Sequence, residues 1–201
     1  MRLRTDSGLL RRSLIAACLV LAGPVLAAVE VEGVMFEENE TVAGQKLVLN
    51  GATASQVLSV KATAVGMYLA NKTNTAEGAF AMKGAKRLRV VALRDITAKD
   101  LANTLLDRIR QNATRDEVEN NILQLAALGG AFNTRPKLVK GDVATWDWNP
   151  VTKSTEVRVN GEQVTQPIQG ETFFPVIMKV WLGPKVKPAT RNNLLGVPNA
   201  G

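Results

Sequence analysis

The chain has 201 residues, of which 46% are hydrophobic and 21% are charged. This balance is typical of a folded globular domain and excludes collagen-like, coiled-coil and disordered chains. The sequence contains no His and a single Cys, Cys18, which excludes imidazole-based catalysis, thiolate chemistry and the usual zinc sites. We therefore expect neither a metal nor a cofactor.

The amino end of the chain has the pattern of an export signal. Basic residues occur up to Arg12, an almost wholly apolar run follows from Ser13 to Leu26, and Val25-Leu26-Ala27 places small residues at the −3 and −1 positions of a cleavage site. The apolar run is shorter than the roughly 20 residues that a membrane-spanning helix needs. We therefore expect a cleaved signal peptide over residues 1–27 and no stable membrane span afterwards.

Two routes of export remain open, because Arg11-Arg12 resembles a twin-arginine motif and also fits an ordinary basic leader. By either route, the sequence predicts a mature domain over residues 28–201 that is periplasmic or secreted.

The positive charge of the chain is a weak indication of its partners. Without residues 1–27, the net charge falls from +7 to +4, from 21 basic and 17 acidic side chains. The basic residues near the carboxyl end, such as Lys185 and Lys187, have no interleaved exposed aromatic residues. We therefore expect a solvated surface there and no nucleic-acid partner.

The mature chain begins with strand patterns. Apolar and polar residues alternate from Val29 to Phe36 and from Lys46 to Asn50, with a turn predicted near Ala43-Gly44. Val57 to Leu69 is rich in β-branched residues, and Gly66 inside it predicts a bulge or the close approach of another backbone. These segments predict neighbouring strands of one sheet.

Helical patterns occupy the middle of the chain. A short helix is predicted over Thr75 to Met82, and the strand Arg87 to Leu93 follows it. Thr97 can then cap a helix whose apolar face contains Leu101, Leu105 and Ile109. Thr114 and Glu117 predict the start of another helix, with an apolar stripe at Val118, Ile122, Leu125 and Ala126 and an end at Gly129-Gly130.

Strands return in the last third of the chain, and helices close it. Strands are predicted over Lys140 to Trp148, Thr155 to Val159 and Gln163 to Ile168, with Asn160-Gly161 as a hairpin turn. Helices are predicted over Glu171 to Leu182 and Ala189 to Leu195. Strands, then helices, then strands and helices again predict one α+β domain, with a sheet and a helix layer.

Two stretches resemble the chalcone isomerase-like family. They are Leu49-Asn50-Gly51-Ala52 with the Lys-x-Thr-Ala-x-Gly-x-Tyr-Leu segment over 61–69, and the carboxyl-terminal pattern from Phe173-Phe174 to Leu194-Leu195-Gly196. The order of elements is similar over residues 29–196. The resemblance implies an α+β open-faced sandwich, with a large antiparallel sheet, a layer of helices on one face and a cleft between them.

The resemblance also implies site residues, of which this chain keeps only some. The enzymes of the family close a ring on a substrate phenolate with an arginine, two threonine-type positions, a tyrosine and an asparagine. Thr63 matches the first threonine and Asn120 matches the asparagine. The remaining positions fall on Ser55 in place of the arginine, Ala113 in place of the tyrosine and Val180 in place of the late threonine.

The loss of the arginine has a chemical consequence. A guanidinium holds an oxyanion or a carboxylate with a fixed fork of donors, whereas the Ser55 hydroxyl is neutral and offers one proton. We therefore expect that neither phenolate positioning nor carboxylate binding survives unless another base moves in. Lys61 and Arg87 are the nearest basic residues by sequence.

The candidate ligand-binding set is Ser55, Thr63, Tyr68 and Asn120. Each has a structural explanation as well, because Thr and Tyr are common in strands and Asn on a helix often faces water. No catalytic residue is established by this pattern, although Thr63 and Asn120 occupy the family's positions.

Three functions follow from these expectations. The first is an exported, non-catalytic protein that binds a small apolar or fatty-acid-like molecule between sheet and helices; a cleft filled by Phe173, Ile177 and Leu125 would count against it. The second is an intramolecular lyase with a rearranged active site. The third is an interaction module with a protein partner in the cell envelope.

Overall fold

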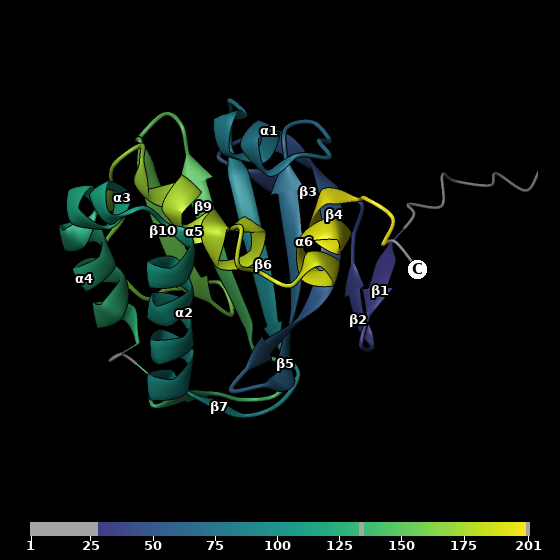
Figure 1. Cartoon of the computed structure of the whole chain (residues 1–201), viewed down its shortest axis with the longest axis horizontal. Helices are drawn as coiled ribbons and strands as arrows, with labels where there is room; N and C mark the ends of the chain where they lie inside the picture. Colours follow the sequence, from purple (N-terminus) through teal and green to yellow (C-terminus); the bar gives the residue numbers. More distant parts are fainter. Residues whose placement is uncertain (1–27, 133–134, 200–201) are drawn as a thin grey trace, which may run out of the picture.

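The computed structural model describes residues 28–132 and 135–199. The predicted signal peptide and Cys18 lie outside these residues. Figure 1 shows a large curved sheet with helices laid across one of its faces. This arrangement confirms the predicted α+β open-faced sandwich.

The main sheet is antiparallel, and its described strands run in the order β11-β10-β9-β6-β5-β4-β3, with β12 also paired to β10. The two longest described strands, β4 and β5, pair with each other on the β3 side of this order. The strands are β1 (Val29–Val31), β2 (Val34–Phe36), β3 (Asn39–Val42), β4 (Gln45–Val57), β5 (Val60–Leu69), β6 (Lys86–Ala92), β7 (Ile96–Thr97), β8 (Lys137–Leu138), β9 (Val143–Asn149), β10 (Ser154–Val159), β11 (Glu162–Gln163) and β12 (Ile168–Gln169).

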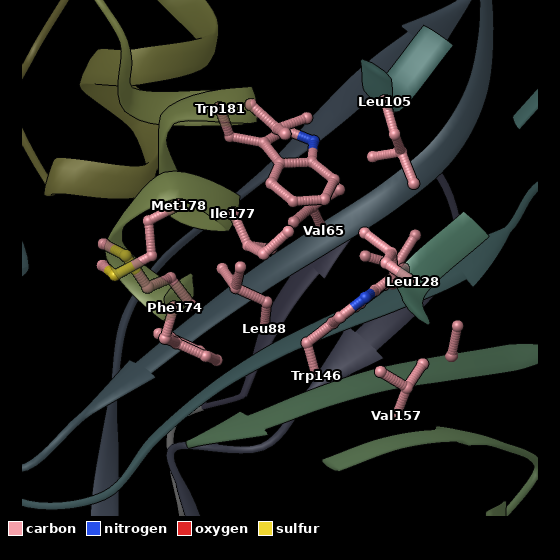
Figure 2. Close-up of a cluster of buried hydrophobic side chains, with 14 of the residues drawn as sticks. Val65, Leu88, Leu105, Leu128, Trp146, Val157, Phe174, Ile177, Met178 and Trp181 are labelled. Carbon is pink, nitrogen blue, oxygen red and sulfur yellow. The ribbon is translucent and has the colours of Figure 1, made fainter. Parts of the chain in front are cut away.

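The helix layer contains two helices with strong apolar faces. The α5 side chains are buried almost throughout, and α2 buries Leu101, Leu105 and Ile109 as predicted. Figure 2 shows Ile177 and Trp181 of α5 pointing at strand residues. The helices are α1 (Ala76–Ala81), α2 (Ala98–Asn112), α3 (Arg115–Asn120), α4 (Ile122–Ala131), α5 (Phe173–Leu182) and α6 (Pro188–Leu195).

The other face of the sheet has a smaller apolar cluster, which contains Phe36 and Tyr68. Gly66 has no side chain on this face, and a Cβ there would lie 2.5 Å from Phe36 Cδ1. The close approach predicted at Gly66 is therefore made by an aromatic ring rather than by another backbone. The β4–β5 register shifts at two other places, near Asn50 and between Ser55 and Gln56.

Predicted turns at Ala43-Gly44 and Asn160-Gly161 are confirmed, and both pairs have positive φ angles. The single strand predicted over Val29 to Phe36 is wrong. Glu32 (φ 51°) and Gly33 (φ 79°) form a turn between β1 and β2. The alternation of apolar residues continues across this two-residue turn, so the sequence pattern does not reveal it.

The helix predicted after Thr114 is two helices. Thr114 and Glu117 form the predicted capping box, but the side chain of Asn121, 1% exposed, interrupts the helix. It donates to the Glu117 carbonyl at 2.8 Å and accepts from Thr172 Oγ1 at 3.0 Å. Because of this break, α4 does not continue the apolar stripe of α3, and Ile122 is exposed rather than buried.

Two further predicted boundaries are wrong. The α4 helix continues through Gly129-Gly130 to Ala131, because glycine permits a helix to end without forcing it to. The predicted strand Gln163 to Ile168 is two short strands, β11 and β12, which pair with different parts of β10.

Candidate functional site

Ser55 on β4 and Thr63 on β5 lie directly opposite each other in the sheet. Both are 3% exposed, and both line a crevice beneath α2 and α5. Thr63 Oγ1 makes only a long hydrogen bond, of 3.5 Å, to the Ser55 carbonyl. The structure therefore brings together two of the four predicted ligand-binding residues, on the face that the helices cover.

A guanidinium from the helix layer reaches this pair. Arg108 of α2 donates through Nη1 to Ser55 Oγ at 3.0 Å and through Nη2 to the Gln56 carbonyl at 2.5 Å. Arg108 therefore brings a cation to Ser55, the position that the resemblance assigned to an arginine, because its side chain extends to the serine from the opposite layer. Sequence analysis did not identify it.

Neither of the two bases nearest in sequence hydrogen bonds Ser55 or Thr63. Ser55 pairs with Thr63 but Gln56 pairs with Lys61, so Ala62 is an extra residue that turns Lys61 away. Lys61 Nζ lies 2.7 Å from Glu32 Oε1 at the surface. Arg87 lies on the other face of the sheet, where it forms a forked ion pair with Asp147.

A second donor points at the same serine oxygen. Trp181 of α5 donates through Nε1 to Ser55 Oγ at 3.2 Å. A serine hydroxyl can accept two hydrogen bonds and donate one. Arg108 and Trp181 fill both accepting positions, so the Ser55 proton is left for a third group. Among the described residues, none accepts it.

The charge of Arg108 is not neutralised by the protein. No carboxylate in the described part of the chain lies within 4 Å of its guanidinium, and both of its recorded acceptors are neutral oxygens. Burial lowers the pKa of Arg108 below its usual value. A half-buried cation with only neutral partners attracts an anion, because desolvation strengthens that interaction.

Arg108 stands at the inner end of an open groove of about 590 Å³. The groove is formed by β1 and the turn after it, β4, α2, and the segment that leads into α6 with the first residues of that helix. Its charged lining residues besides Arg108 are Lys61, Lys185 and Lys187 and the acids Glu30 and Glu32. Asn112 holds two of its walls together, because it donates to the Arg108 carbonyl at 2.9 Å and accepts from the Lys185 amide at 2.8 Å.

Beyond Arg108 the groove narrows into an apolar crevice. Leu101, Leu105, Trp146 and Trp181 line this crevice, which has a free volume of only about 10 Å³. Leu101 and Trp146 also line a neighbouring apolar crevice of about 40 Å³ beside α4. The two crevices are therefore neighbours that share these two side chains.

The centre of the interface between sheet and helices is filled. Phe173, Ile177 and Leu125 are all buried in the main apolar core, and Figure 2 shows Ile177, Trp146 and Trp181 within one cluster of buried side chains. The two indole rings lie 6.1 Å apart, centroid to centroid. This packing counts against a ligand enclosed at the centre of the interface and leaves the groove at Arg108.

The other two predicted ligand-binding residues lie elsewhere. Asn120 is exposed at the end of α3. Tyr68 is fully buried on the opposite face of the sheet, where burial and the nearby Glu40 carboxylate raise its pKa. The structure brings neither of them to Ser55 and Thr63.

A signal for Arg108 is present in the sequence. On α2, Thr104, Arg108 and Asn112 are spaced four residues apart, so they form a polar stripe beside Leu101, Leu105 and Ile109. All three line the groove or the crevice. A polar stripe bordering a buried stripe on a helix that covers a sheet indicates side chains at the edge of the interface.

The side chains that contact the Ser55 hydroxyl are hydrogen-bond donors. The chain has no His, and no described carboxylate bonds to Ser55, Thr63 or Arg108. No cluster of possible metal ligands and no helix long and apolar enough to cross a membrane occurs among the described residues.

Comparisons with known proteins agree with this fold. A family model described as chalcone isomerase-like matches residues 28–196. A solved structure of a fatty-acid binding protein from Arabidopsis thaliana is similar, with a TM-score of 0.62 and 14% sequence identity over 82% of this chain and 92% of that chain. The search of curated proteins found no match.

Proposed function

Because this chain belongs to the chalcone isomerase-like family, we propose that it is a non-catalytic binding protein for a small amphipathic anion such as a fatty acid. The observation that carries the proposal is the Arg108 guanidinium, which hydrogen bonds Ser55 and has no carboxylate partner among the described residues. The fatty-acid binding protein of similar fold supports the choice of ligand class.

In the proposed complex, the carboxylate of the ligand lies in the groove and accepts from the free Arg108 N–H groups and from the Ser55 hydroxyl. Charge-assisted hydrogen bonds of this kind contribute about 1.5–3 kcal/mol each. Lys185 and Lys187 line the same groove, whose lining also contains the acids Glu30 and Glu32, so the carboxylate is expected to lie at the Arg108 end. The head of the ligand therefore binds where the protein already offers unpaired donors.

The apolar part of the ligand follows the crevice beneath α2. The crevice has little free volume, so binding requires α2 to move away from the sheet or Leu101 and Leu105 to change rotamer. Leu101 and Trp146 also line the second crevice, which extends the apolar path toward α4. Chain length is therefore expected to affect affinity.

The test is a calorimetric titration of delipidated protein with a matched pair of ligands. Oleic acid and oleyl alcohol have the same chain, and only the acid presents an anion at neutral pH. We expect the acid to bind at least about tenfold more tightly, which corresponds to roughly 1.4 kcal/mol. Equal affinities, or no binding of the acid, would overturn the proposal.

A second candidate is an intramolecular lyase, and the contact of Arg108 with Ser55 favours it specifically. The same donors that hold a carboxylate could hold a substrate phenolate beside Thr63. Such an enzyme would convert chalcones, and the long-wavelength absorbance of the substrate would fall. Rates equal to the uncatalysed reaction over a panel of chalcones would remove this candidate.

We also propose that residues 1–27 are a signal peptide and that the protein acts in the periplasm or outside the cell. The basic and apolar pattern before Ala28 supports this proposal. Expression of the full chain followed by intact-mass measurement tests it. A mature chain that begins at or within a residue of Ala28, recovered from the periplasm or medium, is the expected result; an uncleaved cytoplasmic chain contradicts it.

A further inference from the structure

A buried lysine lies on a different part of the molecule from the Arg108 groove. Lys86 is the first residue of β6 and is 4% exposed. Its Nζ donates to the Phe80 carbonyl, at the end of α1, at 2.8 Å. Within the described part of the chain, no carboxylate lies within 4 Å of this amine, so its charge has no ionic partner.

Lys86 lines a pocket of about 250 Å³. The pocket lies between α1, the turn that follows β9 and the start of α5, and Phe80, Trp148 and Phe174 supply its aromatic walls. Three aromatic side chains in the lining can pack against an aromatic ring. The Arg108 groove shares none of these lining residues.

The charged groups around this pocket do not neutralise Lys86. Glu171 pairs with Lys153 at 2.5 Å, and Lys179, which lies over the Phe80 ring, pairs with Glu117 at 2.6 Å. Lys83 lies nearby and is positively charged. Glu171 and Glu117 are therefore each paired with a lysine other than Lys86.

The amine is correspondingly less basic than an ordinary lysine. Burial, and next the positive charge of Lys83, lowers the pKa of Lys86 to about 8. A neutral amine still has an N–H to donate to the Phe80 carbonyl and a lone pair besides. Desolvation beside a second cation is a known way of making a lysine nucleophilic.

We propose that Lys86 is the nucleophile of a second binding site, which takes small aromatic aldehydes or ketones and holds them as an imine. The neutral Nζ adds to the carbonyl carbon, and the resulting carbinolamine loses its hydroxyl group as water to give the carbon–nitrogen double bond. One amine and one carbonyl thus give one imine and one water, and no oxidant or reductant takes part.

The experiment uses benzaldehyde with sodium cyanoborohydride, which reduces the imine to a stable secondary amine. The full chain is labelled for short times at about pH 8 and the modified lysines are identified by peptide mass spectrometry. At this pH, a pKa of about 8 gives roughly a hundredfold more neutral amine than an ordinary lysine has. The weaker base is a poorer nucleophile, so we expect labelling about tenfold faster than at Lys83 or Lys153.

Variants distinguish this site from general surface labelling. Lys86→Arg keeps the positive charge and the donor to Phe80, and we expect it to remove the fast phase. Lys83→Gln removes the neighbouring cation and should shift the pH midpoint of Lys86 labelling upward. Arg108→Gln should leave labelling unchanged, because the two sites are separate.

The measurement on the unmodified protein is decisive even where a variant fails to fold. Label spread over exposed lysines with Lys86 no faster than Lys83 would overturn the proposal, as would an absence of label at Lys86. Neither outcome bears on the binding of an anion at Arg108.

Discussion

Arg108 Nη1 lies 3.0 Å from Ser55 Oγ and joins a helix to a strand that is 53 residues away in the sequence. In this chain the strand β4 supplies the alcohol of Ser55, and the helix α2 supplies the guanidinium of Arg108. The cation that the strand lacks at this place is therefore supplied by Arg108 from the helix layer. Because the donors have no anionic partner in the described protein, the arrangement is prepared for a ligand.

The first prediction concerns stability at Arg108. We expect the free energy of unfolding of Arg108→Met to be within about 1 kcal/mol of that of the unmodified protein, or higher. The reason is that an apolar side chain of similar length replaces a desolvated cation that has no carboxylate partner. Denaturant unfolding measures this difference. The matched control is Arg110→Met on the same helix, where the side chain is exposed and pairs with Asp107.

A structural role for Arg108 would give the opposite result. If its two hydrogen bonds chiefly held α2 on the sheet, Arg108→Met would lower the free energy of unfolding by well over 1 kcal/mol, while Arg110→Met would lower it only a little.

The sequence predicted much of the fold and only part of the site, for physical reasons. Periodicity and caps are local, so α2 after Thr97 and the capping box at Thr114 were predicted correctly, whereas the break at Asn121 depends on a contact with the distant Thr172. The side chain of Arg108 meets Ser55 only after two layers pack, and no local pattern encodes that meeting. Tyr68 shows the converse, because it is five residues from Thr63 on an uninterrupted part of β5, so strand alternation alone places the two on opposite faces.

The second prediction concerns Ser55 as a shared acceptor. Ser55→Ala leaves a guanidinium N–H and the Trp181 Nε1–H without their partner, so we expect a loss of about 1–3 kcal/mol in unfolding free energy. A double-mutant cycle with Trp181→Phe measures the part that belongs to the indole hydrogen bond. Strictly additive losses would show that Ser55 and Trp181 are not coupled.

The third prediction concerns the packing of Phe36 against Gly66. Gly66→Ala places a Cβ 2.5 Å from Phe36 Cδ1, in a cluster where Phe36 has no exposed surface. We expect a loss of about 1–3 kcal/mol in unfolding free energy from this overpacking. In a Phe36→Leu background the same substitution should cost less, and an equal cost in both backgrounds would show that the ring is not the cause.

The fourth prediction concerns acid stability at Asp142. Hydrogen bonds from Asn160 Nδ2 and from the Val139 amide, both 2.9 Å long, hold the pKa of Asp142 below its usual value. A depressed carboxyl pKa stabilises the folded state above the unfolded pKa of about 4, and this contribution is lost as the pH falls through the folded pKa. Asp142→Asn should therefore be less stable at neutral pH, by about 1 kcal/mol.

The difference between Asp142→Asn and the unmodified protein should narrow as the pH falls below about 4, because the unmodified carboxyl then becomes neutral as well. Unfolding measured at several pH values checks this convergence. A stability difference that stays constant from neutral to acidic pH would contradict the lowered pKa of Asp142.

The most direct test of anion binding is a calorimetric titration of oleate into three delipidated proteins: unmodified, Arg108→Gln and Arg110→Gln. Arg108→Gln keeps hydrogen-bond donors but removes the charge, and we predict at least about tenfold weaker binding, or roughly 1.4 kcal/mol, with Arg110→Gln unchanged. Equal affinity for oleate in the unmodified protein and in folded Arg108→Gln would contradict the account.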